Sequence, residues 1–362
     1  MMAIDTQLYP ALLAAKCDRV ESLLAPFDPP PAERFASPEQ GFRLRAEFRI
    51  WHEGDDLFYA MFDRADPKTP IRVEHFPIAA PRIQRAMSQL RELLLPDPVL
   101  RRKLFQVEFL STLSGELLIT LVYHRALEAD WETAARALES ALNAGIIGRS
   151  RKQKLVLSQD WVEEVLPLED GEFRYRQYEQ GFTQPNGAVN CEMVSWACRQ
   201  ASALQGDLLE LYCGNGNFTL PLSRHFDCVL ATEVSKRSIE AALHNCASNG
   251  IDNLSLARLS AEEMSAALAG EREFRRLQNL PQPLADYRFN TLFVDPPRAG
   301  LDGGTLAMAA GFDNILYVSC NPDTLADNLS VLSRTHRVEA LALFDQFPYT
   351  EHMECGVRLA RR

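Results

Sequence analysis

Two different spacings of apolar residues divide the chain. The first half mixes strict apolar–polar alternation, which is typical of half-buried strands, with stretches at helical spacing. The patterns predict, in order, a helix over 8–27, strands over 42–52 and 57–62, a helix over 82–95, strands over 105–113 and 117–124, a helix over 131–144 and a short strand over 154–157. Asp130 and Gly145 are predicted to cap the third helix. Hairpins with interleaved helices indicate an antiparallel α+β domain.

The pattern changes at a turn-rich junction, GFTQPN, at residues 181–186. From Ala188 onward, helical segments alternate with short apolar runs, as expected for a mostly parallel, doubly wound, Rossmann-like α/β sheet. The predicted strands are 207–211, 228–232, 253–257, 290–294, 314–318 and 338–344. We therefore expect two domains, 1–180 and 181–362.

The stretch LLELYCGNGNFTLP, from Leu208 to Pro221, has the order strand, glycine turn and helix that opens a nucleotide site. Thr219 stands where a dinucleotide fingerprint needs its third glycine, so the turn suits pyrophosphate poorly. Glu233 ends the next apolar run, where a carboxylate can accept hydrogen bonds from a ribose. This combination favours S-adenosylmethionine over a nicotinamide dinucleotide, although an ordinary glycine turn remains an alternative from this stretch alone.

Polar residues follow three later strands, and parallel strands present their carboxyl ends at one sheet edge. Asp295 follows the strand over 290–294, Cys320 follows that over 314–318, and Glu354 comes after that over 338–344. Cys320 precedes an Asn-Pro pair that opens a helix, and a helix N-terminus lowers the pKa of a thiol, so Cys320 is a candidate nucleophile. Alternatively, Asp295 caps a turn and Glu354 is a surface carboxylate.

Composition indicates an ordinary globular protein. The 362 residues are 46% hydrophobic and 24% charged. No apolar run reaches the length of a membrane span, and the N-terminus lacks the pattern of an export signal. The eight cysteines have no paired spacing, which favours reduced thiols and a cytoplasmic location.

The net charge of −11 argues against nucleic acid as a partner, yet basic residues cluster in the first half. The clusters are Arg43, Arg45 and Arg49; Arg101, Arg102 and Lys103; and Arg149, Arg151, Lys152 and Lys154. The first of them shares one face of a predicted strand with Trp51, and arginine with tryptophan can hold phosphate and base. A solvated sheet face is the alternative.

Four segments together resemble the RNA uracil-C5 methyltransferases, and within them the bacterial tRNA (uracil-54-C5)-methyltransferases. The segments are GDLLELYCGNGNFTLPL, FVDPPRAGLD, ILYVSCNPDTLADNL and LFDQFPYTEHMECGVRL. Two further segments, FRLRAEFRIWHEGDDLFYAMFD and LFQVEFLSTLSGELLITLVYH, resemble the RNA-binding domain of those enzymes. The resemblance covers nearly the whole chain, without a departure at a catalytic position.

The resemblance implies a covalent mechanism. A thiolate from Cys320 adds to uracil C6, C5 takes the methyl group of S-adenosylmethionine, and Glu354 removes the C5 proton so that the thiol is eliminated. It implies cofactor contacts from Gln184, Tyr212, Asn217, Glu233 and Asp295. From its charge, Arg298 is expected to steady the uracil or the developing enolate oxygen, and RNA contacts are expected from Arg49, Phe105 and His124.

The expected substrates are the T-arm of tRNA, with the uridine at position 54, and the equivalent uridine of tmRNA, bound by a monomer. No metal site is expected. Ribosomal-RNA uracil methyltransferases are the nearest alternative, but many carry four cysteines for an iron–sulfur cluster, and here Cys17 is the only cysteine before Cys191. A non-catalytic RNA-folding factor, which would not need Cys320, is an alternative of another class.

Overall fold

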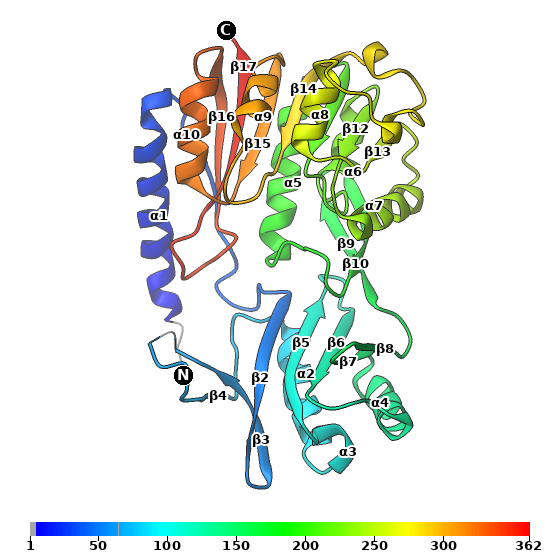
Figure 1. Cartoon of the computed structure of the whole chain (residues 1–362). Helices are drawn as coiled ribbons and strands as arrows, with labels where there is room; N and C mark the ends of the chain where they lie inside the picture. The colour runs from blue at the N-terminus through cyan, green and yellow to red at the C-terminus, as the bar shows by residue number, and fades with distance from the viewer. Residues whose placement is uncertain (1–4, 64) are drawn as a thin grey trace. The chain divides into compact units, whose positions relative to one another are not determined.

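The computed structural model describes residues 5–63 and 65–362, which form two compact units (Figure 1). The first consists mainly of Pro38–Val165 and Arg176–Gly187, and the second of Gln7–Ser37, Leu166–Tyr175 and Ala188–Arg362. The units therefore depart from a single boundary at residue 180. None of the helices within the described ranges is long and apolar enough to cross a membrane.

The second unit is built on an eight-stranded sheet with the order β1-β16-β17-β15-β14-β11-β12-β13. Its strands are β1 (Glu33–Phe35), β11 (Asp207–Leu211), β12 (Val229–Thr232), β13 (Leu254–Ala257), β14 (Phe289–Val294), β15 (Asn314–Ser319), β16 (His336–Phe344) and β17 (Glu354–Arg361). The pairs are parallel except those of β17, which runs antiparallel to both β15 and β16. The six strands predicted for this half are confirmed, whereas β1 and β17 were not predicted.

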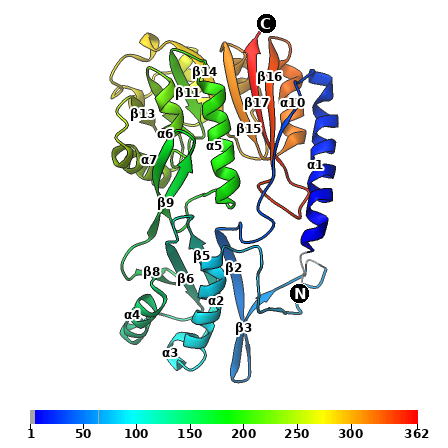
Figure 2. The same ribbon diagram turned by 180° about the vertical axis from the view of Figure 1, so that it is seen from behind.

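Helices cover both faces of this sheet, as in a doubly wound fold (Figures 1 and 2). They are α1 (Tyr9–Leu24), α5 (Gly187–Ala201), α6 (Thr219–Leu222), α7 (Lys236–Asn249), α8 (Ala261–Leu268), α9 (Gly303–Ala309) and α10 (Pro322–Leu332). Successive strand residues point to opposite faces. Leu209 accordingly packs in the same core as residues of α1 and α10, and Leu208 in the core under α5.

The N-terminal segment belongs to the second unit for two reasons. Cys17, Val20 and Leu24 of α1 lie in one apolar core with strand residues of the large sheet. After α1, the short strand β1 pairs in parallel with β16. Helical spacing predicted α1 itself but could not reveal which sheet it covers, because the partner core lies hundreds of residues away.

The first unit contains a seven-stranded sheet with the order β4-β3-β2-β5-β6-β7-β8. Its strands are β2 (Arg45–Glu53), β3 (Asp56–Met61), β4 (Ile71–Val73), β5 (Leu104–Ser111), β6 (Leu117–Tyr123), β7 (Gly145–Ser150) and β8 (Gln153–Val156), and its helices are α2 (Pro81–Leu94), α3 (Pro98–Arg101) and α4 (Ala129–Leu142). Apolar residues of α2 and α4 pack on one face of this sheet.

The first sheet is antiparallel except at β6 and β7, which pair in parallel because α4 crosses between them. The predicted ends of α4 were wrong. Its N-cap is Glu128 rather than Asp130, and Asn143, in the left-handed region at φ 46°, ends it. Gly145 begins β7, a strand that the sequence did not predict.

A two-stranded hairpin, β9 (Trp161–Leu168) and β10 (Gly171–Tyr178), contributes residues to both units. Short 3-10 helices complete the described ranges: η1 (Thr6–Leu8), η2 (Ala25–Phe27), η3 (Ser223–His225), η4 (Arg275–Leu277) and η5 (Leu284–Asp286).

Candidate active site

The expected catalytic pair meets at the carboxyl edge of the large sheet. Ser319, the last residue of β15, pairs with Cys355 of β17. The ladder ends at this pair, and Cys320 and Glu354 are the residues next to it on the two strands. The Glu354 carboxyl is close enough to raise the pKa of the Cys320 thiol. Asp295 follows β14, the parallel neighbour of β15. Strand β17, which sequence analysis missed, is thus the element that brings Glu354 to this edge.

Cys320 occupies a tight turn between β15 and α10. The Ser319 hydroxyl accepts a hydrogen bond from the Asn321 amide (3.2 Å) and donates to the Asn321 carbonyl (3.1 Å). The Asn321 side chain caps α10 by accepting from the Asp323 amide. The predicted strand–Cys–helix arrangement is confirmed, with the thiol half-buried.

The expected lowering of the thiol pKa was wrong. Burial first, and then the carboxyls of Glu354 and Asp295, raise the pKa of Cys320 to about 11, although Arg298 acts in the opposite direction. Desolvation and two nearby acidic groups therefore outweigh the start of α10. The site holds a thiol at neutral pH, and a nucleophilic reaction requires a base to take its proton.

Three carboxyl groups of this region have raised pKa values because they lie away from water. Burial raises the pKa of Asp295 to about 7 and that of Glu210, on β11, to about 8. Glu354 is only 4% exposed, and burial together with Asp295 raises its pKa well above the usual range. Strongly shifted acids grouped with a thiol are typical of catalytic sites.

A hollow of about 270 Å³ opens beside Cys320. Its lining combines cationic and anionic side chains: Arg19, Arg298, Cys320, Asn321, Pro322, Asp323, Glu351 and His352. Arg298 is exposed, and its guanidinium lies 3.5 Å from Nδ1 of His352. Its carbonyl accepts bonds from the side chains of Asn321 (3.1 Å) and Thr324 (3.2 Å). The Arg298 backbone is thus tied to the start of α10, next to Cys320.

The glycine turn after β11 has the backbone that its sequence predicts. Gly214 (φ 57°) and Gly216 (φ 89°) both lie in the left-handed region, which glycine adopts without strain. A Cβ at Gly216 would come within 2.2 Å of Leu220 Cδ1, whereas one at Gly214 would meet nothing. Tyr212, also left-handed at φ 62°, begins the turn. The open side of Gly214 leaves its backbone accessible to a ligand.

Glu233 stabilises this turn. Its carboxylate accepts bonds from the amides of Gly214 (3.1 Å) and Ser235 (2.7 Å), so the ends of β11 and β12 are joined. Each carboxylate oxygen keeps a further lone pair, which leaves acceptors for a hydroxyl pair. On β11, the buried Oε2 of Glu210 has no hydrogen-bond partner among the described residues. A turn accessible at Gly214 beside these acceptors fits a nucleoside-type cofactor with hydroxyl and ammonium donors.

Asn217 makes a reciprocal amide pair with Asn190 of α5, at 2.9 Å in both directions. Its carbonyl accepts from the Tyr175 hydroxyl (3.0 Å), and Asn245 of α7 donates to the carbonyl of Asn215 (2.9 Å). The sequence analysis missed Asn190, Tyr175 and Asn245. A buried asparagine inside an amphipathic helix, such as Asn190, was the available signal.

Gln184 lies in the 176–187 segment of the first unit, whereas Tyr212, Asn217, Glu233 and Asp295 belong to the second. The structure thus brings four of the five expected cofactor residues to one edge of one unit. The cofactor role of all five residues remains a prediction.

The first unit presents a separate cluster on the outer side of its sheet. The Arg49 guanidinium lies 3.9 Å from the centre of the Phe105 ring, and Phe105 stacks on His124 with centroids 4.0 Å apart. Trp51 and Phe62 extend the cluster edge to face. Arg49 and His124 are exposed. The three side chains predicted to contact RNA are therefore adjacent.

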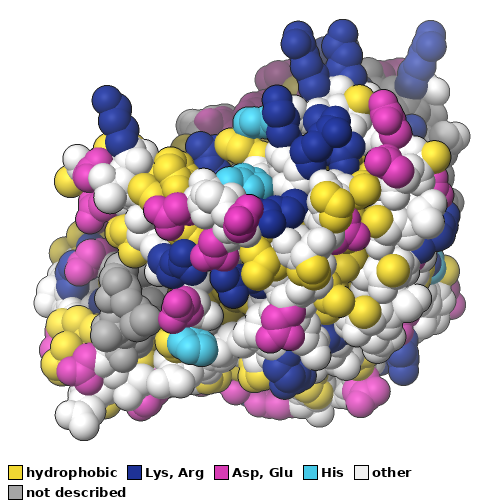
Figure 3. Space-filling view, turned by 90° about the horizontal axis from the view of Figure 1, so that it is seen from below, with side chains coloured by type: hydrophobic (Ala, Val, Ile, Leu, Met, Phe, Trp, Pro, Cys, Tyr) yellow, Lys and Arg dark blue, Asp and Glu magenta, His cyan; other side chains and the backbone are white. Residues whose placement is uncertain are grey.

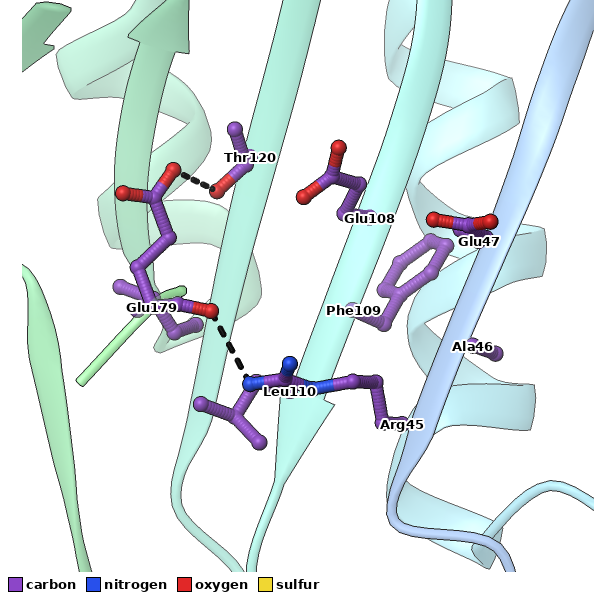
Figure 4. Close-up of a pocket in the computed structure, with 9 residues that line it drawn as sticks. Arg45, Ala46, Glu47, Glu108, Phe109, Leu110, Thr120 and Glu179 are labelled. Carbon is purple, nitrogen blue, oxygen red and sulfur yellow. Dashed lines mark hydrogen bonds between the residues drawn. The ribbon is translucent and has the colours of Figure 1, made fainter. Parts of the chain in front are cut away.

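The other basic groups of this half differ from one another. The space-filling view in Figure 3 shows lysine and arginine side chains spread over the face seen from below, with several close together along one edge. Arg45, however, donates to the carbonyl of Glu179 at 3.0 Å (Figure 4). It also donates to the carbonyl of Gly181 at 3.0 Å. Burial lowers its pKa, as it does that of Arg43. Arg45 thus differs from Arg49, because its hydrogen bonds commit it to the protein. The RNA-facing role of the set remains a prediction.

The basic cluster from 149 to 154 is also partly neutralised. Arg149 forms a bidentate ion pair with Glu179: its Nε donates to Oε1 at 2.6 Å and its Nη2 to Oε2 at 2.7 Å. Lys154 contacts the same carboxylate at 3.1 Å and Asp160 at 2.7 Å. Within the described residues, this cluster therefore offers fewer free charges than its sequence indicates.

Comparison with known proteins gives consistent matches. The family model tRNA (Uracil-5-)-methyltransferase matches residues 8–362. A tRNA/tmRNA (uracil-C(5))-methyltransferase of Azoarcus sp. (strain BH72) is 57% identical over 357 residues, 99% of this chain and 98% of the relative. One of the same name from Neisseria meningitidis serogroup B is 52% identical over 357 residues, with 98% and 99% covered.

Among solved structures, the fold is similar to that of Pyrococcus abyssi tRNA (uracil-54, C5)-methyltransferase in complex with S-adenosyl-L-homocysteine. The TM-score is 0.73 at 20% identity, and the match covers 97% of this chain and 83% of the other. At this identity the likeness concerns the fold.

Proposed function

Because the chain belongs to the tRNA (uracil-5-)-methyltransferase family, we propose that it methylates C5 of the T-loop uridine at position 54 of tRNA, and the equivalent uridine of tmRNA. The chain is an S-adenosyl-L-methionine-dependent methyltransferase that acts on uracil C5 in RNA. The observation that carries the proposal is the antiparallel ladder of β15 and β17, which ends at Ser319 and Cys355, the residues directly next to Cys320 and Glu354.

In the proposed reaction, Cys320 is the nucleophile. Uracil C5 attacks an electrophile poorly by itself, so the Cys320 sulfur adds to C6 and pushes the C5–C6 electron pair toward C4 and its oxygen, as an enolate. The raised pKa of the thiol has a cost and a benefit. The proton must first pass to a base, but the thiolate so formed is strongly nucleophilic.

S-adenosyl-L-methionine, when bound, supplies an electrophilic methyl group on a sulfonium centre. We assign its binding to Tyr212, Asn217, Glu233 and Asp295 of the second unit, and Gln184 stays a further predicted contact of the cofactor. The accessible face at Gly214, the held carboxylate of Glu233 and the unpartnered Oε2 of Glu210 support this assignment.

Glu354 then completes the reaction as general base. Once C5 carries the methyl group, the Glu354 carboxylate takes the C5 proton, the C5–C6 double bond re-forms and the S–C6 bond breaks. A carboxyl whose pKa is raised by burial is a stronger base than an exposed one. Arg298, beside the hollow at Cys320, is suited to steady the uracil or the enolate oxygen by its charge.

The first unit is proposed to bind the RNA. Arg49, Phe105 and His124 combine a cation with stacked rings on an exposed face, which suits backbone phosphates and unstacked bases. The target uridine must leave its stack to reach a half-buried thiol.

A tRNA transcript that contains 5-fluorouridine tests the proposal. Fluorine at C5 cannot leave as a proton, so the reaction with S-adenosylmethionine should stall as a covalent complex that survives a denaturing gel. We expect the complex with the natural protein and with Cys228→Ala, a matched control at the opposite end of the sheet, but not with Cys320→Ala. Replacing only the T-loop uridine by its unfluorinated form should abolish the complex.

If the transcript binds but neither the natural protein nor any variant forms a complex, the assignment of Cys320 is wrong. If the complex persists without fluorine in the T-loop, the target position is wrong.

A further inference from the structure

The loop between β16 and β17, residues 345–353, leads directly into Glu354, and helix α1 holds it. Lys16 of α1 is 5% exposed, and its ammonium group donates to three acceptors along this loop. The acceptors are the Asp345 carboxylate at the start, the Phe347 carbonyl (3.2 Å), and the His352 carbonyl (3.0 Å), two residues before Glu354. One side chain thus ties both ends of the loop to one point.

Further contacts from α1 reach the same loop. The Arg19 guanidinium donates to the Glu351 carbonyl (3.3 Å), and the Tyr9 ring packs on Tyr349 with centroids 5.6 Å apart. The Asp345 carboxylate is fully buried, so its negative charge needs the Lys16 ammonium as a partner.

The loop backbone indicates that it is held from outside. Tyr349 lies at φ 62°, in the left-handed region that bulky residues adopt only at a cost. Such a conformation persists where the surrounding contacts over-determine it, and it is common beside active sites. Here, the surrounding contacts include those of Lys16, Arg19 and Tyr9.

We infer that Lys16 is a positioning residue for the proposed general base: by tying Asp345, Phe347 and His352 together, it sets Glu354 in line with the C5 proton. This inference rests on the proposed function. Its consequence is specific to one step. Addition of Cys320 and methyl transfer precede proton removal, so they should tolerate a loosened loop better than the elimination does.

The test separates these steps with ordinary tRNA in single-turnover reactions. Denaturing gels follow the covalent adduct, and loss of tritium from C5 follows proton removal. In Glu354→Gln the adduct should form and persist, which provides the reference. In Lys16→Met, which keeps most of the side-chain length but removes the charge and its donors, the adduct should form within about 2-fold of the natural rate.

Its release in Lys16→Met should be slower by about 10- to 100-fold, as expected when a reacting group is misplaced by about an ångström. Asp345→Asn, which keeps the shape of the side chain, should show the same pattern and serves if Lys16→Met does not fold. Asp18→Ala on the exposed side of α1, where Asp18 pairs only with Arg34 among the described residues, is the matched control and should leave both rates unchanged.

Equal slowing of adduct formation and release in the folded Lys16 and Asp345 variants would mean a general structural role and would overturn the inference. Unchanged release would overturn it as well. The absence of any adduct in Glu354→Gln and with 5-fluorouridine RNA would instead remove the proposed function, and this inference with it.

Discussion

The outer face of the first unit is exposed to solvent, whereas the carboxyl edge of the sheet in the second unit contains buried acidic groups. Arg49 and His124 stand exposed around Phe105, where charge and ring faces stay available to a large polyanion. Glu210 and Glu354 are 1% and 4% exposed, and burial raises the pKa of both. Recognition of RNA benefits from charges that stay exposed to solvent. A covalent step benefits from buried groups, because burial shifts their pKa values away from the values that they have in water.

The comparison predicts that binding and chemistry are separable. Cys320→Ala should reduce methylation by at least about 10⁴-fold, because no other group would activate C5. Its affinity for tRNA, measured by filter binding, should remain within about 2-fold of the natural value. A large loss of affinity would show that the carboxyl edge of the large sheet also contributes to tRNA binding, so that binding and chemistry are not separable.

The buried carboxyl of Glu210 should lower the free energy of unfolding of the second unit, by an amount that depends on pH. The pKa of Glu210 is about 8 in the folded chain against about 4.5 when unfolded. Below 4.5 the carboxyl is protonated in both states and costs nothing. As pH rises from about 4.5 to about 8, the carboxyl ionises only in the unfolded state, so stability falls, and above about 8 the loss is complete.

Glu210→Gln should therefore stabilise the second unit at pH 9 relative to pH 5, by on the order of 3 kcal/mol. Urea unfolding at both pH values measures this difference. Arg49→Met on the exposed face is the control and should show no such dependence. Equal effects of Glu210→Gln at both pH values would mean that this carboxyl is ionised in the folded protein.

Removing an aromatic ring from the outer face of the first unit should weaken tRNA binding moderately. Phe105→Ala should raise the KM for tRNA about 10-fold, since stacking on a base contributes about 1–3 kcal/mol. The kcat at saturating tRNA should not change. Leu113→Ala, at an exposed apolar residue of the same unit, is a control for general surface changes. A lower kcat with unchanged KM would place Phe105 in the chemical step instead.

The smallest expected effect is on the titration of Cys320. Its pKa of about 11 owes part of its rise to Glu354, so Glu354→Gln should lower it by up to about one unit. The pH dependence of iodoacetamide labelling, read by mass spectrometry of the peptide that carries Cys320, measures this shift. An unchanged profile would mean that burial alone sets the proton affinity of the thiol.

Much of the local structure followed from short-range patterns. Alternation over 42–52 predicted β2 and placed Arg49 and Trp51 on its outer side. The runs before Tyr212, Asp295 and Cys320 were each confirmed as strands that end directly before those residues. These predictions succeeded because apolar spacing, glycine turns and a proline at a helix start depend on neighbouring residues.

Other features depend on residues far apart in the chain, so no local pattern could reveal them. Arg43 and Arg45 share a periodicity with Arg49, but only the folded chain shows that Arg45 is bonded to the carbonyls of Glu179 and Gly181. The thiol pKa was predicted in the wrong direction because the helix start is local, whereas Glu354 and Asp295 come from other strands.

The sequence by itself determined the individual strands of the doubly wound sheet, the glycine turn and the Cys320 turn, since each of these elements is encoded in fewer than twenty consecutive residues. Only the tertiary structure decided that β17 runs antiparallel and brings Glu354 to the edge where Cys320 lies, and that α1 secures the preceding loop through Lys16. The physical reason is that strand pairing, burial and the pairing of buried charges are long-range properties: each arises only when distant segments exclude water from one another.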